Sequence, residues 1–353
     1  MKHRVTIAGA FPLEEGGTLN DVSVEVRTWG RHRKNATLIC HALTGDANAD
    51  EWWSGLFGAG RVFDPATSFI VSMNVLGSCY GTTGPTSVGP SGTPYGADFP
   101  AVTIRDLVEV QRHVLDQLGV ETLDLVIGGS MGGMQVLEWA IMYPHRVGAI
   151  VPIGVGAAQS PWAIALSEAQ RHAITSDSAF KGGAYPEYRK PTAGLETARM
   201  IAMVSYRSHA EFATRFGRSS DSEGFAAQSY LRHQGKKFVD RFDANTYLTL
   251  IDAMDSHDVG RARGPSEAIL RRVEIPGLVV AISTDVLYPP AEVRALAAAL
   301  PRCRYAVLDS VHGHDGFLVD TDALNALVVD FRNSLNRADS TATTPTGLGA
   351  AWA

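Results

Sequence analysis

Apolar and polar positions divide the chain into short apolar runs that alternate with longer stretches of helical spacing. The apolar runs predict buried strands at residues 36–40, 69–73, 123–127, 149–154, 277–282 and 305–308, and residues 22–29 alternate as an edge or hairpin strand does. Helical patterns cover residues 103–118, 131–143, 291–300 and 322–335. Strands and helices that alternate at this spacing predict an α/β fold, a mainly parallel sheet with helices on both faces.

The alternation breaks between about Ala157 and Ile269, where helical patterns follow one another without strand signals. We expect this block to be a helical lid over the carboxyl ends of the strands, where ligands bind in such sheets. The expected organisation is a core of residues 1–156 and 270–336, a lid of residues 157–269 and a tail of residues 337–353. The tail is rich in Ser, Thr, Ala and Gly, so we expect it to be disordered.

Composition and charge narrow the class of protein. With 353 residues, of which 45% are hydrophobic, the chain can bury a sizeable core. The net charge of −6 argues against a nucleic-acid partner. No run of 18 apolar residues occurs, and the first ten residues lack the apolar stretch of a signal peptide. We therefore expect a soluble, cytoplasmic protein with no membrane partner.

The three cysteines, Cys40, Cys79 and Cys303, are widely spaced and odd in number. This pattern favours reduced thiols over a disulfide framework. We interpret them as small buried hydrophobic residues, although the glycine-rich surroundings of Cys79 allow a role in a pocket. No histidine or cysteine spacing suggests a metal site.

Residues 126–135 place four glycines around Ser130, directly after a predicted strand and before a predicted helix. A sharp turn there would lift the serine hydroxyl away from the backbone, and Gly128 and Gly132 would avoid a clash where strand and helix cross. The amide of Met131 would then lie at a helix N-terminus, where an oxyanion forms. A flexible turn without chemistry is the alternative, because a Gly-x-Ser-x-Gly match is weak by itself.

A serine hydroxyl needs a base to take its proton and a third group to hold that base. In folds with this turn the chain order is Ser, then Asp or Glu, then His. Asp285 and His314 each follow a predicted strand beyond the helical block, as that order requires. Asp285 could instead cap the following helix, and His312 lies two residues before His314, so the pattern alone does not separate the two histidines.

Seven stretches match the motifs of one known family: HALTG at 41–45, NVLGSCYGTTGP at 74–85, YGADFP at 95–100, IGGSMGGMQ at 127–135, SYR at 205–207, TDVLYP at 284–289 and GHDGFL at 313–318. The chain resembles the homoserine O-acyltransferases, members of the α/β-hydrolase fold that acylate homoserine on the methionine pathway. The resemblance covers about residues 10–335. It implies that Ser130 is the nucleophile and His314 the base oriented by Asp285, with the amides of Leu43 and Met131 as oxyanion donors.

The resemblance also implies the acceptor site. Arg199 and Tyr206 lie seven residues apart, on one face of a predicted helix, and match the family residues that bind the acceptor. Asp315 matches the residue that holds its ammonium. Without the resemblance, Arg199 would be interpreted as a solvated surface residue.

The implied reaction is ping-pong transfer from acetyl-CoA to L-homoserine without a metal or prosthetic group, in a homodimer formed through the lid. The rivals are an esterase, a succinyl-CoA donor, serine as acceptor, and a catalytically inactive binding protein. We further expect the loop of residues 77–81 to shape the pocket floor, and Trp52 and Trp53 to pack near the cleft.

Overall fold

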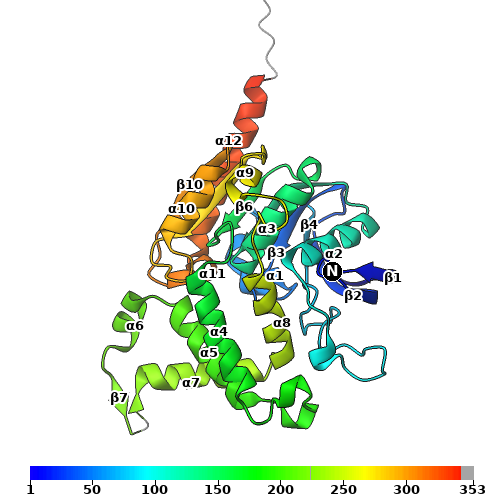
Figure 1. The fold of residues 1–353 in the computed structure, drawn as a ribbon. Helices are drawn as coiled ribbons and strands as arrows, with labels where there is room; N and C mark the ends of the chain where they lie inside the picture. The colour runs from blue at the N-terminus through cyan, green and yellow to red at the C-terminus, as the bar shows by residue number, and fades with distance from the viewer. Residues whose placement is uncertain (223, 343–353) are drawn as a thin grey trace, which may run out of the picture.

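The computed structural model describes residues 1–222 and 224–342 and contains an eight-stranded sheet of order β1-β2-β4-β3-β5-β6-β9-β10 (Figure 1). The strands are β1 (Lys2–Pro12), β2 (Thr18–Trp29), β3 (Asn35–Cys40), β4 (Ile70–Met73), β5 (Thr122–Gly129), β6 (Ile150–Ile153), β9 (Gly277–Ile282) and β10 (Cys303–Leu308). β2 runs antiparallel to both its neighbours, and the pairs from β4 to β10 are parallel. The predicted α/β fold is confirmed.

The helices are α1 (Ala49–Trp52), α2 (Ile104–Gln117), α3 (Met131–Met142), α4 (Pro161–Thr175), α5 (Thr192–Tyr206), α6 (His209–Phe216), α7 (Ala226–Val239), α8 (Ala244–Asp255), α9 (Ser266–Leu270), α10 (Pro290–Ala299), α11 (Gly316–Val319) and α12 (Thr321–Ala342). Helix α2 begins with a reciprocal cap: the Thr103 side chain accepts from the Asp106 amide at 3.2 Å, and the Asp106 carboxylate accepts from the Thr103 amide at 2.8 Å. This reciprocal cap satisfies two amides that the first helical turn leaves unpaired.

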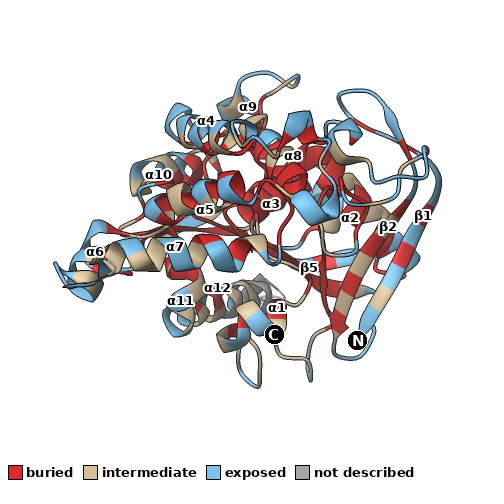
Figure 2. Ribbon diagram, turned by 90° about the horizontal axis from the view of Figure 1, so that it is seen from below, coloured by how far each residue is buried: buried red, intermediate tan, exposed pale blue. Residues whose placement is uncertain are grey.

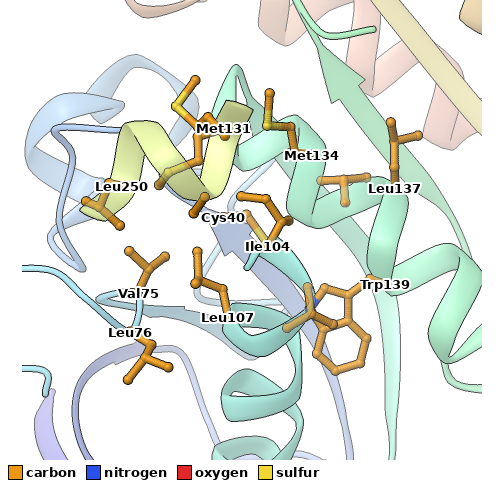
Figure 3. Packing of buried hydrophobic residues seen from close by; sticks show 14 of the residues in the cluster. Cys40, Val75, Leu76, Ile104, Leu107, Met131, Met134, Leu137, Trp139 and Leu250 are labelled. Atoms are coloured by element: carbon orange, nitrogen blue, oxygen red, sulfur yellow. The ribbon is translucent and has the colours of Figure 1, made fainter. Parts of the chain in front are cut away.

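Two hydrophobic clusters lie on opposite faces of the sheet. Adjacent strand residues alternate between them, as Val126 and Ile127 do in β5. One cluster packs the sheet against α2, α3 and α10, and the other packs it against α12. Figure 3 shows the first cluster around Met131 and Trp139, with Leu250 of α8 on the Met131 side. The start of α3 is therefore held in a packed core.

Helices α4 to α9 are inserted between β6 and β9; α4 to α8 gather at one end of the sheet, whereas α9 lies away from that end (Figure 1). Within this block α5 packs against α4 and α7. Burial is concentrated in the sheet, α3 and α8, whereas α6 and α7 expose much of their surface (Figure 2). Through Leu250, α8 fixes the inserted helices to the core.

The structure differs from the sequence predictions at three places. β1 was not predicted; it pairs with β2 at the sheet edge. Two-residue strands β7 (Ser220–Asp221) and β8 (Gly224–Phe225) interrupt the inserted helices. Helix α12 continues to Ala342, so the first residues of the expected disordered tail are helical, and residues 343–353 lie outside the described part. None of the described helices is both long and apolar enough to cross a membrane.

Candidate active site

Ser130 occupies the sharp turn between β5 and α3, with φ 58° and ψ −126°. A left-handed φ at a non-glycine residue costs about 1–3 kcal/mol and persists only where the surroundings enforce it. The strand and helix that flank this turn approach Cys40 so closely that they require glycine: a Cβ on Gly128 would lie 2.6 Å from the Cys40 carbonyl oxygen, and one on Gly132 would lie 2.9 Å from the Cys40 carbonyl carbon. The predicted strained turn, with glycines where helix and strand cross, is present.

His314 and Asp285 form a buried pair, with Nδ1 of the imidazole 2.7 Å from Oδ2 of the carboxylate. The second carboxylate oxygen accepts from the amides of Leu287 and Tyr288 at 2.8 and 2.9 Å. Burial alone would lower the pKa of His314, but the Asp285 carboxylate outweighs it, so this pKa lies above its ordinary value. With its proton on Nδ1, the neutral ring has a lone pair on Nε2.

Nε2 of His314 is buried and has no hydrogen-bond partner among the described residues. The Ser130 hydroxyl lines the same cavity but does not donate to this nitrogen in the structure. Such bonds are often long in ligand-free enzymes and tighten with substrate. His312 does not line the cavity; its Nδ1 lies 3.4 Å from the Glu211 carboxylate instead. The geometry thus separates the two histidines that the pattern left open.

A cavity of about 560 Å³ brings together six of the predicted site residues: Leu43, Ser130, Arg199, Tyr206, His314 and Asp315. The core loops and the inserted helices both contribute to its walls. Asp285 lies behind His314, and Met131 is fully buried at the start of α3. The eight residues therefore form one contiguous group.

The amides of Leu43 and Met131 do not donate to any other residue in the ranges that the structure describes. The turn that carries Leu43 is held by His41, whose Nδ1 lies 2.8 Å from the Ala42 carbonyl oxygen and whose Nε2 accepts from the Val75 amide at 3.1 Å. Burial lowers the pKa of His41, consistent with a neutral ring. Sequence reasoning missed this histidine, although it begins the HALTG motif.

Arg199 and Tyr206 share the face of α5 that lines the cavity. The Arg199 guanidinium lies 5.6 Å from the Tyr206 ring centre and 5.0 Å from that of Phe238. Its Nη1 is buried and has no hydrogen-bond partner in the described part of the chain. Asp315 lies across the cavity wall, where burial raises the pKa of its carboxyl group even though Arg207 opposes the shift. A half-buried cation with an unpartnered nitrogen and a nearby carboxylate suit a ligand that carries both charges.

Two further cations line the cavity that sequence reasoning did not identify, Lys237 of α7 and Arg241 just beyond it. Arg241 donates from Nη1 to the Thr44 carbonyl at 3.0 Å and to the Tyr80 hydroxyl at 2.5 Å. No sequence motif marks these cations, because the fold alone brings α7 to the cavity.

The loop of residues 77–81 contributes no residue to the lining of this cavity, and its Tyr80 hydroxyl instead accepts from the lining residue Arg241. Trp52 does line the cavity, and buried Trp53 donates to the Phe317 carbonyl at 2.8 Å, as packing residues near a cleft would.

The cysteines are all free thiols. Cys40 is buried as predicted, whereas Cys79 and Cys303 are only partly buried, and Cys79 does not line the cavity. Among the described residues no cluster of three or more His, Cys, Asp or Glu side chains could hold a metal ion.

Comparison with known proteins identifies relatives over nearly the whole chain. Residues 35–321 match the family model of the alpha/beta hydrolase fold. The homoserine O-acetyltransferase of Trichormus variabilis is 53% identical over 332 residues, which cover 92% of each chain. Among solved structures, esterase E22 superposes with a TM-score of 0.87 at 26% identity, covering 94% of this chain and 99% of that one. Homoserine O-acetyltransferase from Staphylococcus aureus gives 0.78 at 27% identity, with 94% and 95% covered.

Proposed function

The chain belongs to the homoserine O-acetyltransferases of the α/β-hydrolase fold, and we propose that it transfers an acetyl group from acetyl-CoA to the side-chain hydroxyl of L-homoserine. This is the acyltransferase step on the methionine pathway that the family resemblance implies. The observation that carries the proposal is the cavity, in which Ser130 and His314 lie beside Arg199, whose buried Nη1 has no hydrogen-bond partner among the described residues.

In the first half-reaction, Nε2 of His314 takes the proton of Ser130 as the serine oxygen attacks the thioester carbon. Asp285 holds the imidazole in the required tautomer and stabilises the imidazolium. The tetrahedral oxyanion accepts hydrogen bonds from the Leu43 and Met131 amides. When the intermediate collapses, the C–S bond breaks, the imidazolium proton passes to the leaving sulfur, and acetyl-Ser130 remains.

In the second half-reaction, homoserine binds with its carboxylate on Arg199 and Tyr206 and its ammonium on Asp315. A guanidinium offers paired donors to a carboxylate. Nη1 of Arg199 is already shielded from solvent and has no hydrogen-bond partner among the described residues. The homoserine hydroxyl gives its proton to His314 and attacks the acetyl carbon. O-Acetylhomoserine leaves, and the Ser130 hydroxyl recovers the proton.

Transfer must compete with hydrolysis, and this competition distinguishes the proposal from its nearest rival. Water is present at about 55 M and an amino acid at about 1 mM, so equal use requires a preference of about 10⁴–10⁵, or roughly 6–7 kcal/mol. Charged anchors that hold the acceptor in attacking geometry supply such a preference. The structural likeness to esterase E22 makes hydrolysis the alternative that an experiment must exclude.

The remaining parts of the proposal concern the donor and the setting. Lys237 and Arg241 would offset the phosphate charges of coenzyme A at the cavity. We also propose that the enzyme is a cytoplasmic homodimer, formed through the inserted helices as the family resemblance implies. It would bind neither nucleic acid nor membranes, and it would need no cofactor beyond its co-substrate.

The test combines purified protein with acetyl-CoA or succinyl-CoA, each with L-homoserine, L-serine or no acceptor. Free thiol and the mass of the ester product are measured, and Ser130→Ala serves as the inactive control. The proposal predicts thiol release that depends on homoserine, with O-acetylhomoserine as product. Equal thiol release without an amino acid would establish an esterase, and faster turnover with succinyl-CoA or serine would change the donor or the acceptor.

A further inference from the structure

Arg207, the residue that ends α5, contacts the proposed ammonium ligand from behind. Its Nε lies 3.1 Å from Oδ2 of Asp315, and the two side chains are 17% and 15% exposed. Asp315 lines the cavity, whereas Arg207 does not. Any effect of Arg207 on a bound acceptor must therefore pass through the Asp315 carboxylate.

Arg207 is itself held in place by Glu211 of α6. Nη1 of Arg207 lies 3.0 and 3.2 Å from the two oxygens of the Glu211 carboxylate. The Glu211 side chain is only 8% exposed. Glu211 also faces His312 at 3.4 Å and Arg215 at 3.6 Å. Asp315, Arg207 and Glu211 thus form a partly buried series of alternating charges that leads from the cavity to α6.

The backbone joins these elements closely. Gly313, one residue before His314, has φ +65°, and a Cβ there would lie 2.7 Å from the Arg207 carbonyl carbon and the Ser208 amide nitrogen. The Ser208 hydroxyl donates to the Val311 carbonyl. The end of α5 and the loop that carries the catalytic histidine therefore pack as one unit, which sets the position of Arg207 relative to Asp315 before any ligand binds.

We propose that Arg207 is a positioning residue for the acceptor: it fixes one oxygen of Asp315 so that the other is presented to the homoserine ammonium. This inference rests on the proposed function, in which Asp315 is the ammonium ligand. A charge-assisted contact to a carboxylate restricts its rotation, and fewer conformations are then lost when the ligand binds.

Arg207 also acts on the charge of Asp315. Burial favours the neutral carboxyl group and raises its pKa, while Arg207, then His314 and Arg199, oppose the shift and Glu211 reinforces it. Only the carboxylate binds an ammonium ion well, so acceptor affinity must fall as pH drops through this pKa. Loss of Arg207 raises the pKa further, and the loss of affinity then begins at a higher pH.

The test is Arg207→Met, which keeps a long unbranched side chain and removes its charge. The KM for homoserine should rise by about 10- to 100-fold at pH 7, as expected when a partly buried carboxylate loses its cationic partner. The acidic limb of homoserine binding, measured in a Ser130→Ala background so that proton transfer to His314 does not contribute, should move to higher pH. The rate at which acetyl-CoA acetylates Ser130, measured in single turnover without acceptor, should change by less than about threefold.

Arg215→Met is the matched control, because Arg215 faces the same Glu211 carboxylate. Within the described part of the chain, Arg215 forms no ion pair with Asp315. We expect near wild-type KM for this variant. Arg207→Lys restores the charge without the planar donor, so it should restore the pH limb while the homoserine KM stays raised by about threefold or more.

Unchanged homoserine KM and pH limb in Arg207→Met would overturn the inference, as would an equal loss in both half-reactions. If Arg207→Met does not fold, Arg207→Lys decides the matter, and a wild-type KM in that variant would count against the positioning role. These outcomes differ from failure of the proposed function itself, in which the wild-type protein would form no acetylhomoserine at all.

Discussion

Gly132→Ala tests whether the crossing of α3 and β3 sets the geometry of the oxyanion site. In a helix, alanine is normally favoured over glycine by about 0.5–1 kcal/mol, so any loss of stability must be steric. The new Cβ would lie 2.9 Å from the Cys40 carbonyl carbon, and the carbonyl oxygen is closer still. Carbon atoms pack best at about 3.5–4.0 Å, so the two backbones must separate by about 0.6 Å or more.

This separation displaces the chain three residues before Leu43, one of the two proposed oxyanion donors. Overpacking of this kind costs about 1–3 kcal/mol. Complete loss of one oxyanion donor costs about 10²–10³ in kcat, so partial displacement should slow the acetylation of Ser130 by about 10- to 100-fold. Thermal unfolding and a single-turnover assay of thiol release from acetyl-CoA measure the two effects separately.

Gly133→Ala is the matched control on the same helix. The added Cβ would lie 2.8 Å from the Val155 side chain, and its three nearest neighbours are atoms of Val155 and Ile153 rather than of the Cys40 backbone. We expect a stability loss without the large fall in acetylation rate. Wild-type acetylation by Gly132→Ala, or an equal fall in both variants, would refute the argument that this crossing positions the oxyanion donors.

Three further predictions concern single side chains. Arg199→Met should raise the homoserine KM by about 30-fold or more and change acetylation of Ser130 little, because only acceptor binding loses its cationic partner. Steady-state and single-turnover rates compare the two, and equal losses would contradict the assignment. His314→Ala should abolish acetylation of Ser130, whereas His312→Ala should not. In the wild-type protein the acetylation rate should fall as pH drops through the raised pKa of His314, because only the neutral ring accepts the serine proton. A pH series of single-turnover rates tests this. Lys237→Ala should raise the KM for acetyl-CoA by about threefold or more. The neighbouring residue Lys236 does not line the cavity, so Lys236→Ala should leave this KM unchanged. If the KM for acetyl-CoA does not depend on salt concentration in either variant, a phosphate contact is contradicted.

The sheet and the serine turn could be predicted because their signals are local. Buried strands are short apolar runs, and the glycines around Ser130 mark a crossing that only a residue without Cβ permits. β1 escaped prediction because most of its residues are exposed, so no clear apolar face appears in the sequence. The end of α12 has no apolar period that would distinguish it from a polar tail.

The candidate site was only partly predictable. Strand order placed Asp285 and His314 after adjacent strands, but the choice of His314 over His312 needed either the resemblance or the 2.7 Å contact. The pairing of Arg207 with Asp315 joins residues more than one hundred positions apart, and no local pattern encodes it. Contacts of this kind depend on how the inserted helices pack on the core, which side-chain periodicity does not specify.

The central claim is that Ser130 carries the acetyl group between donor and acceptor. The most direct measurement is the intact mass and peptide map of the protein after mixing with acetyl-CoA alone, followed by addition of homoserine. The account predicts one acetyl group on the peptide that contains Ser130, removed by homoserine with formation of O-acetylhomoserine and absent in Ser130→Ala. Turnover to acetylhomoserine by the Ser130→Ala variant, or an acetyl group on another residue that homoserine discharges, would contradict it.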